Sequence, residues 1–246
     1  MKEVIAIVSR KGGSGKTTTA QAIGAALRAK GDRVLLIDLD AQCNLSASMG
    51  ADLDGINGTQ LFEPGANVRH AIQHTGNGDI IAGSKFFAGA DLIIKNNQEI
   101  KKALTPLLPE YDYIIFDTPA TYGRMTTNAL TAATSAIITV EAAPFSYQGI
   151  DELTAIIEQI KEANPALNLR GIVITKYDGR SNAAKRNLDD FRAKAQQIGT
   201  SVIDPPIRAT AKVFEAQGEC RNLNDYAPRS TAAQDYNSIA EVIHNW

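Results

Sequence analysis

The stretch from Lys11 to Thr18, KGGSGKTT, has the residue types and spacing of a phosphate-binding loop. Its glycines let the backbone bend so that successive N–H groups point inward, at phosphate oxygens. In such a loop Lys16 reaches the β- and γ-phosphates, and the Thr17 hydroxyl is a ligand of Mg²⁺. The alternative is a glycine-rich turn, but a turn gives no packing reason for the Gly-Lys-Thr ending. The stretch therefore predicts a nucleoside triphosphate site with Mg²⁺, whose binding residues are Gly12, Gly13, Ser14, Gly15, Lys16, Thr17 and Thr18.

Three aspartates stand where a carboxylate can complete this site, each at or just after the end of an apolar run. Asp117 ends one run and is expected to hold Mg²⁺ through water. Asp40 follows another run and is expected to orient the water that attacks the γ-phosphate. Any one of these aspartates could instead be a turn or helix-cap residue, and for Asp38 a purely supporting role stays open. The predicted metal-site residues are Thr17, Asp40 and Asp117.

Apolar runs that have the pattern of buried strands alternate with helical patterns along the chain. Strands are predicted at 4–8, 34–37, 113–116, 136–140, 171–175 and 201–203, and helices at 17–30, 124–133, 148–163, 183–197 and 231–243. This alternation indicates an α/β fold of three layers, a mostly parallel twisted sheet with helices on both faces. Ligands bind such sheets beyond the carboxyl ends of the strands, where the polar residues above fall. Residues 51–89 are predicted to be a less regular surface elaboration.

Length and composition limit the class of protein. The 246 residues fit one α/β domain, which is predicted to span 1–246. A net charge of −2 excludes a protein covered in positive charge, although a local basic patch remains compatible with it. Two cysteines far apart exclude a disulfide framework and favour a reducing, cytoplasmic location. No apolar run approaches the roughly 20 residues that cross a bilayer, so no membrane partner is expected.

In combination, the motifs resemble those of the deviant-Walker ATPases, and within them the ParA/Soj-type partition ATPases of the MinD/ParA superfamily. The resemblance covers nearly the whole chain. It rests on KGGSGKTTT at 11–19, VLLIDLDAQ at 34–42, YIIFDTP at 113–119, GIVITKYDGR at 171–180 and APRS at 227–230. The chain departs from the family at Ala41 and Ala120, where the family commonly has proline. These departures affect the geometry of two loops and leave the carboxylates in place.

The resemblance implies a slow, partner-stimulated P-loop ATPase that hydrolyses ATP with Mg²⁺. Lys11 would reach across an ATP-dependent homodimer to the phosphates of the other subunit, and Lys11, Lys16 and Asp40 would be the catalytic residues. Thr175 and Pro206 would border the adenine. The ATP-bound dimer would bind double-stranded DNA without sequence preference, on the nucleoid, and with a ParB-like centromere-binding partner would position a plasmid, chromosome or mobile element. The alternative for Lys11 is a solvated surface lysine.

A local basic stretch is the candidate for DNA contact. Residues 170–194 carry seven basic and three acidic side chains, a net charge of +4. Such cations can neutralise phosphates without reading sequence, and the alternative is a solvated helix face of mixed charge. By the resemblance, Arg180 falls where ParA-type proteins carry a DNA-contacting arginine. The candidate DNA-contacting residues are Arg180, Lys185, Arg186, Arg208 and Lys212.

Two other functions stay open. A MinD-like ATPase that acts on a membrane or a protein cluster would share the phosphate site, but membrane attachment needs a basic amphipathic C-terminal helix. The tail after Arg229 has no Lys or Arg. The second alternative is a nucleotide switch that binds ATP and hardly hydrolyses it. An N-terminal helix-turn-helix domain is not expected, because only ten residues precede Lys11.

Overall fold

A seven-stranded sheet forms the centre of the molecule, and only its edge strand β3 runs antiparallel to its neighbour. The structure is a computed structural model that describes residues 2–143 and 146–246. The orientation of the strands confirms the predicted, mostly parallel sheet. Across the sheet the strands are β3 (Ile72–Thr75), β4 (Gly78–Ile81), β2 (Val34–Asp38), β5 (Tyr113–Asp117), β1 (Glu3–Val8), β6 (Ser135–Glu141) and β7 (Asn168–Thr175).

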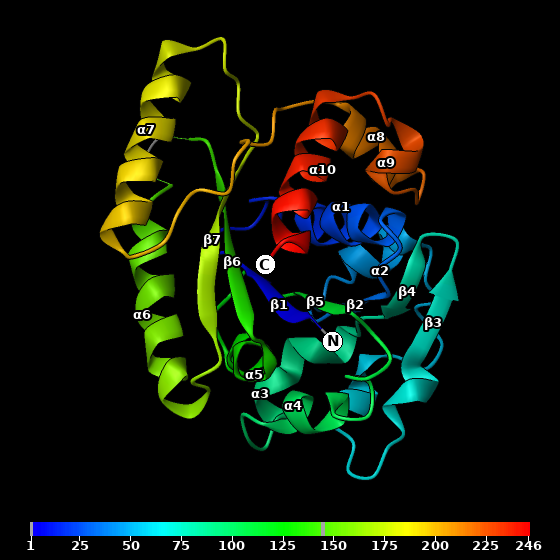
Figure 1. Cartoon of the computed structure of the whole chain (residues 1–246). Helices are drawn as coiled ribbons and strands as arrows, with labels where there is room; N and C mark the ends of the chain where they lie inside the picture. The colour runs from blue at the N-terminus through cyan, green and yellow to red at the C-terminus, as the bar shows by residue number, and fades with distance from the viewer. Residues whose placement is uncertain (1, 144–145) are drawn as a thin grey trace.

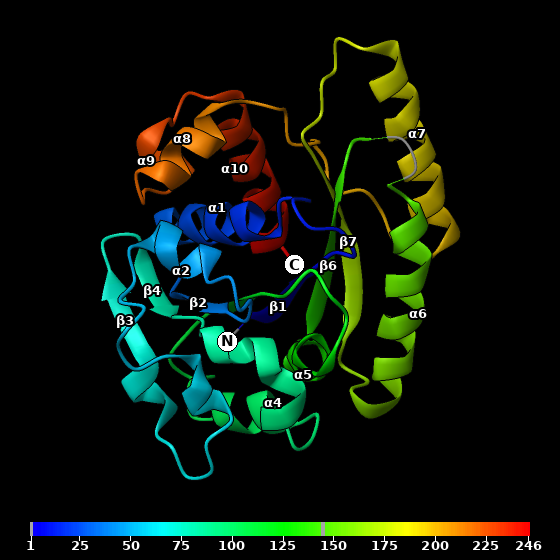
Figure 2. The same cartoon turned by 180° about the vertical axis from the view of Figure 1, so that it is seen from behind.

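Helices cover both faces of the sheet, which confirms the predicted three-layer fold (Figure 1; Figure 2). One face carries α1 (Lys16–Ala29), α2 (Asn44–Met49), α8 (Lys212–Gly218), α9 (Leu223–Tyr226) and α10 (Thr231–His244). The other carries α3 (Ala90–Ile93), α4 (Glu99–Leu104), α5 (Arg124–Ala132), α6 (Gln148–Ala163) and α7 (Asn182–Gln197). Short 3-10 helices are η1 (Gly58–Leu61), η2 (Val68–Ala71) and η3 (Lys85–Gly89). The five predicted helices agree with α1, α5, α6, α7 and α10 to within one residue at each end.

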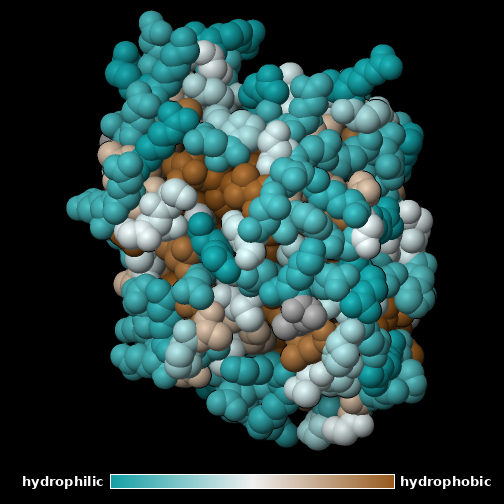
Figure 3. All heavy atoms as spheres, in the orientation of Figure 1, coloured by the Kyte–Doolittle hydropathy of each residue, from teal (hydrophilic) through white to brown (hydrophobic). Residues whose placement is uncertain are grey.

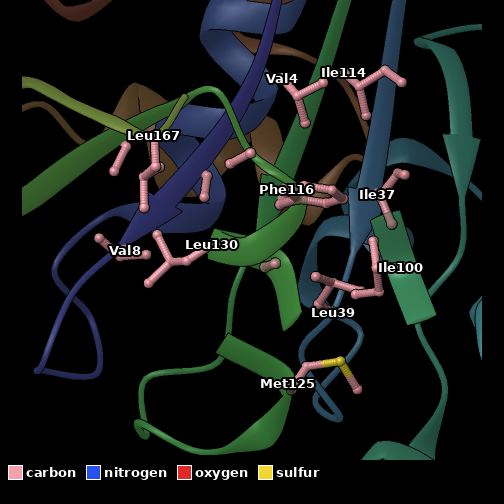
Figure 4. Packing of buried hydrophobic residues seen from close by; sticks show 14 of the residues in the cluster. Val4, Val8, Ile37, Leu39, Ile100, Ile114, Phe116, Met125, Leu130 and Leu167 are labelled. Carbon is pink, nitrogen blue, oxygen red and sulfur yellow. The ribbon is translucent and has the colours of Figure 1, made fainter. Parts of the chain in front are cut away.

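Two hydrophobic cores follow from the alternation of side chains along buried strands. Every residue of β1 is buried. Its Val4 and Val8 lie in the core that α5 and α6 cover, and its Ile5 and Ile7 lie in the core that α1 and α10 cover. Figure 4 shows the first of these cores, where Val4 and Phe116 come from neighbouring strands. Each such side chain contributes about 1.5–3 kcal/mol through its burial, so packing on both faces stabilises the sheet that positions the loops.

Two predictions about strands are wrong. No strand was predicted in residues 51–89, but this region contains the hairpin β3–β4, and β4 pairs in parallel with β2. Residues 201–203 form no strand, because they meet β7 only through an isolated bridge between Val202 and Ile172. The two prolines that follow have no N–H group with which to extend that pairing.

The surface in the view of Figure 3 is mainly hydrophilic, and hydrophobic residues show chiefly in hollows between the elements. Within residues 2–143 and 146–246, no helix combines the length and the apolarity that crossing a membrane requires. The apolar face of α10 packs against α1 and the sheet, with Ile239 and Ile243 fully buried.

Candidate functional site

The loops that follow five parallel strands meet at one edge of the sheet and form the candidate site. Residues 9–15 join β1 to α1, so the predicted strand before the phosphate loop and the helix after it are confirmed. Gly13 (φ 74°) and Gly15 (φ 87°) take left-handed backbone conformations, which glycine adopts without steric cost. A Cβ atom on Gly15 would lie 3.1 Å from Cγ2 of Thr175, closer than ordinary contact. The glycines therefore let the loop turn tightly against β7.

Two neighbouring strands hold the phosphate loop through Ser14, which is buried. Its hydroxyl lies 3.2 Å from the hydroxyl of Thr139 in β6. Its carbonyl accepts a hydrogen bond of 2.8 Å from the hydroxyl of Thr175, the last residue of β7. Thr175 was predicted to border the adenine. In the structure its hydroxyl lies within hydrogen-bond distance of the Ser14 carbonyl and, at 3.2 Å, of the Val140 carbonyl, so Thr175 supports the loop. Thr175 also lines the main cleft described below, so its predicted contact with the adenine stays a prediction.

Thr175→Val is expected to weaken ATP binding about 3- to 10-fold, because it removes one buried hydrogen bond to the loop while it keeps the volume of the side chain. A titration with a fluorescent ATP analogue measures this effect. The matched control is Thr154→Val, which removes a threonine hydroxyl bonded to the Ile150 carbonyl within α6. Equal affinities for the two variants would show that the Thr175 bond does not shape the loop.

Lys16 and Thr17 open α1 at the floor of the loop. Lys16 is only 6% exposed, and burial lowers the pKa of its ammonium group, while Asp117 and Asp40 nearby oppose that shift. The Thr17 hydroxyl donates a hydrogen bond of 2.6 Å to Oδ2 of Asp117. The structure thus brings together the loop lysine, the loop threonine and both predicted carboxylates.

Asp117 has the features of a carboxylate that can bind a cation. It ends β5 next to Asp38, is 1% exposed, and its Oδ1 has no hydrogen-bond partner among the described residues. Burial raises its pKa, and the charge of Asp38 raises it further. Mg²⁺ is commonly held by one or two carboxylates together with phosphate oxygens and water. The Thr17–Asp117 pair fits that pattern, and within the described residues no group of three or more His, Cys, Asp or Glu side chains offers another metal site.

Asp38 and Asp40 have different roles. Asp38 is fully buried and accepts hydrogen bonds from the backbone N–H of Ser46 (2.9 Å), the Ser46 hydroxyl (2.7 Å) and the backbone N–H of Asp40 (3.0 Å). These contacts make Asp38 a support of the segment that joins β2 to α2. Ser46, its partner, is a supporting residue that no sequence motif marks. Asp40 is half-buried and faces the cleft described below. Among the described residues its side chain accepts one hydrogen bond, a local one of 3.0 Å from the N–H of Gln42 to Oδ1, so Asp40 is the aspartate placed to meet a ligand.

A cleft of about 1100 Å³ opens beside the phosphate loop, and we call it the main cleft. The loop, residues 16–18 and Asp40 line one side, and residues 207–211 and α8 line the other. Pro206 was predicted to border the adenine, but it is not among the lining residues. No motif marks α8 in the sequence. Its Gln217 nevertheless donates a 3.0 Å hydrogen bond to the hydroxyl of Thr18, 199 positions away.

Lys11 stands outside the main cleft of its own chain. Its side chain is 65% exposed, and its Nζ lies 3.3 Å from Oε2 of Glu141, the last residue of β6. It lines a smaller neighbouring cavity of about 300 Å³. The other oxygen of Glu141 lies 3.8 Å from Nζ of Lys176. In a single subunit, therefore, Lys11 does not line the cleft in which Lys16 is buried.

Three of the five candidate DNA-contacting residues lie at the start of α7. Arg180, in the preceding turn, is 92% exposed in its side chain and pairs with Asp178 at 2.8 Å. Lys185 and Arg186 are exposed in the first turns of the helix. Hydrophilic residues cover α7 at the upper left of Figure 3. These three cations are accessible to a polyanion.

Arg208 and Lys212 lie elsewhere. The Arg208 guanidinium pairs with both carboxylate oxygens of Asp235 in α10, at 2.7 and 2.9 Å, and lines the main cleft. Lys212 begins α8 and pairs with Glu215 at 2.6 Å. Because α7 and α8 stand apart in both views (Figure 1; Figure 2), the structure does not join Lys212 to the cations of α7 within one subunit. The backbone of Arg208 forms a bridge with Tyr177, three residues before Arg180, but its guanidinium is held by Asp235.

Sequence comparisons identify relatives along nearly the whole chain. A family model described as an AAA domain matches residues 2–169. The chain is 35% identical over 212 residues to the chromosome partitioning protein ParA of Myxococcus xanthus, covering 82% of this chain and 75% of that protein. It is 31% identical over 252 residues to the sporulation initiation inhibitor protein Soj of Bacillus subtilis, covering 99% and 98%.

Solved structures share the fold. Cobyrinic acid a,c-diamide synthase from Mycobacterium smegmatis, with bound ATP analog and magnesium, superposes with a TM-score of 0.86 at 29% identity, covering 100% of this chain and 95% of that one. A putative plasmid partition protein from Borrelia burgdorferi, bound to AMPPNP, has a TM-score of 0.84 at 21% identity, covering 100% and 99%. The second likeness extends to the fold alone.

Proposed function

We propose that this chain, which belongs to the ParA/Soj family of P-loop ATPases, is an ATP-driven dimer that positions a DNA cargo. The position of Lys11 supports this proposal most directly. The lysine is exposed, lies outside the main cleft of its own subunit, and begins the loop that binds phosphate. A second subunit docked on this face would receive its ammonium group. The solved structures that share this fold are described as proteins of different functions, so the proposal rests on the residues of the site rather than on the fold.

ATP with Mg²⁺ is the ligand that the main cleft fits. Similar structures hold ADP or an ATP analog with magnesium. The N–H groups of the loop and the ammonium of Lys16 would bind the phosphates, and Thr17 and Asp117 would hold Mg²⁺. When bound, that ion neutralises phosphate charge. The carboxylate of Asp40 would orient the attacking water. The proposed activity is hydrolysis of ATP to ADP and phosphate, slow until a partner stimulates it.

The proposed dimer completes each site with a group from the other subunit. Lys11 would move from Glu141 to the phosphates across the interface and stabilise the charge of the transition state, as an arginine finger does. Glu141 would keep Lys176 as a cationic partner when Lys11 leaves. ATP would then control assembly as well as supply the bond that breaks.

Double-stranded DNA is the proposed surface on which the ATP-bound dimer acts. The exposed cations at the start of α7 support this part of the proposal, since phosphate contacts give binding without sequence preference. A ParB-like centromere-binding protein is the proposed partner, and nucleoid DNA in the cytoplasm the proposed location. Membrane attachment is the weaker alternative, because the apolar face of α10 is buried against α1 and Arg170 stacks on Trp246 beyond its end.

Arg180→Glu is expected to weaken retention of the ATP-bound protein on DNA about 10-fold or more at low salt, because it reverses one cation in each subunit. ATP affinity is expected to stay at the wild-type value, since Arg180 lies outside the main cleft. Binding to unrelated DNA duplexes, measured with ATP and with ADP, tests the expectation. Arg69→Glu is the matched control, because Arg69 is an exposed arginine paired with Glu110 far from α7. Wild-type retention by the Arg180 variant would remove α7 from the DNA-binding surface.

A further inference from the structure

Phe214 is a large aromatic side chain that the structure leaves open to solvent. It is 82% exposed, on α8, and it lines the main cleft. Neither hydrophobic core contains it. An exposed aromatic ring inside a ligand cleft is unlike a scattered surface residue, because such clefts combine apolar walls with a few polar groups that fix the ligand.

The helix that carries Phe214 is attached to the phosphate loop. One turn further along α8, Gln217 bonds to Thr18, directly after the lysine and threonine of the loop. Ala216 of the same helix is buried in the core that α1 and α10 cover, and the Tyr226 hydroxyl donates a hydrogen bond of 3.0 Å to Glu215. The wall of the cleft at Phe214 is thus held at a fixed place relative to the phosphate end.

The size of the main cleft indicates what kind of ligand fits between the phosphate loop and Phe214. A volume of about 1100 Å³ is more than a triphosphate needs and suits a whole nucleotide. In the segment before Phe214, the cleft is lined by the small or apolar residues Ile207, Ala209 and Ala211, alternating with Arg208 and Thr210. Stacking on an aromatic face is the interaction open to every nucleobase, because every base has a π-face.

We propose that Phe214 is the stacking platform for the base of the nucleotide whose phosphates the loop holds. This inference rests on the proposed function, and it places the base against α8 instead of Pro206. The ligand class is a nucleoside triphosphate, and Phe214 contributes affinity for its base but none for its phosphates. A substitution of Phe214 should therefore change the affinity for ATP and leave the affinity for the phosphate chain alone unchanged.

The test compares two probes, ATP and inorganic tripolyphosphate, by calorimetric titration of the full chain. Phe214→Ala is expected to weaken ATP binding roughly 10-fold and to leave tripolyphosphate binding unchanged. Phe214→Trp, which keeps an aromatic face, is expected to keep ATP affinity within about 3-fold. Phe86→Ala is the matched control, because Phe86 in η3 is 73% exposed and does not line the main cleft.

Two outcomes overturn the inference. Unchanged ATP affinity in Phe214→Ala would show that no base stacks there, and equal losses for ATP and tripolyphosphate would assign Phe214 to the structure of the cleft. Failure of the proposed function is separate, since the wild-type protein would then bind neither probe. Loss of DNA retention by Phe214→Ala at saturating ATP, with ATP affinity unchanged, would identify a DNA base as the occupant and also overturn it.

Discussion

Lys16→Ala is expected to lower ATP affinity by at least about 100-fold. Removal of one partner of a buried charged contact costs about 2–5 kcal/mol or more. Lys16 is 6% exposed and lines the main cleft together with the loop glycines Gly12, Gly13 and Gly15. No other described lysine lines the floor of the main cleft, because Lys176 is exposed at its rim. Equilibrium titration with an ATP analogue measures the loss.

The control for Lys16→Ala must separate binding from folding, because Lys16 also faces two carboxylates. Those carboxylates are Asp117 and Asp40. Removal of Lys16 leaves Asp117, which is buried beside Asp38, with one cation fewer. We therefore expect a lower melting temperature together with a native circular dichroism spectrum. Lys30→Ala removes an exposed lysine just beyond the end of the same helix and should leave ATP binding unchanged. Wild-type ATP affinity in a folded Lys16→Ala protein would contradict the phosphate-loop assignment.

Asp40→Ala is expected to lower the rate of ATP hydrolysis by about 100-fold or more while ATP still binds, because the change removes the group that orients water. The structure explains why the loop should survive. The bond from Asp40 to Asp38 uses the backbone N–H, which alanine retains. The protein should therefore accumulate in its ATP-bound, DNA-retained form. Single-turnover hydrolysis and DNA retention, measured on the same preparation, check both parts.

Two controls accompany Asp40→Ala. Asp54→Ala removes an exposed aspartate away from the main cleft and should behave as wild type. Asp38→Ala should instead destabilise the fold, since it leaves the N–H and hydroxyl of Ser46 without their acceptor. If Asp40→Ala hydrolyses ATP at the wild-type rate, another group positions the water and the assigned role of Asp40 is wrong.

The strands at the centre of the sheet were predictable because burial on both faces demands continuous apolar runs, such as VIAIV in β1 and YIIF in β5. The edge was not predictable in the same way. β3 and β4 are four residues each, and their sequences, IQHT and GDII, carry polar residues because one face of an edge hairpin meets solvent. The apolar run at 201–203 gave the opposite error. Val202 and Ile203 are buried, but a single bridge rather than a ladder joins the run to β7.

The phosphate-binding residues of the site were predictable because they adjoin one another in the chain and all contact the same ligand group. The residues that hold them in place were not predictable from the sequence. Ser46 binds Asp38, and Gln217 binds Thr18, through contacts that only the folded chain creates. Arg208 likewise meets Asp235 after a separation that no local pattern encodes. Motifs therefore predict which atoms meet the ligand, and tertiary contacts decide which groups keep them in place.

The shared active site is the central claim, and a mixture of two inactive variants tests it most directly. In a dimer of one Lys11→Ala and one Asp40→Ala subunit, one site has Asp40 of its own and Lys11 from its neighbour, so it is intact. Random pairing makes about half of the dimers mixed, each with one intact site of two, so an equimolar mixture should recover roughly a quarter of wild-type ATP turnover. If Lys11 acts within its own subunit, every site lacks one residue. Turnover of the mixture that stays at the average of the two variants would contradict the account.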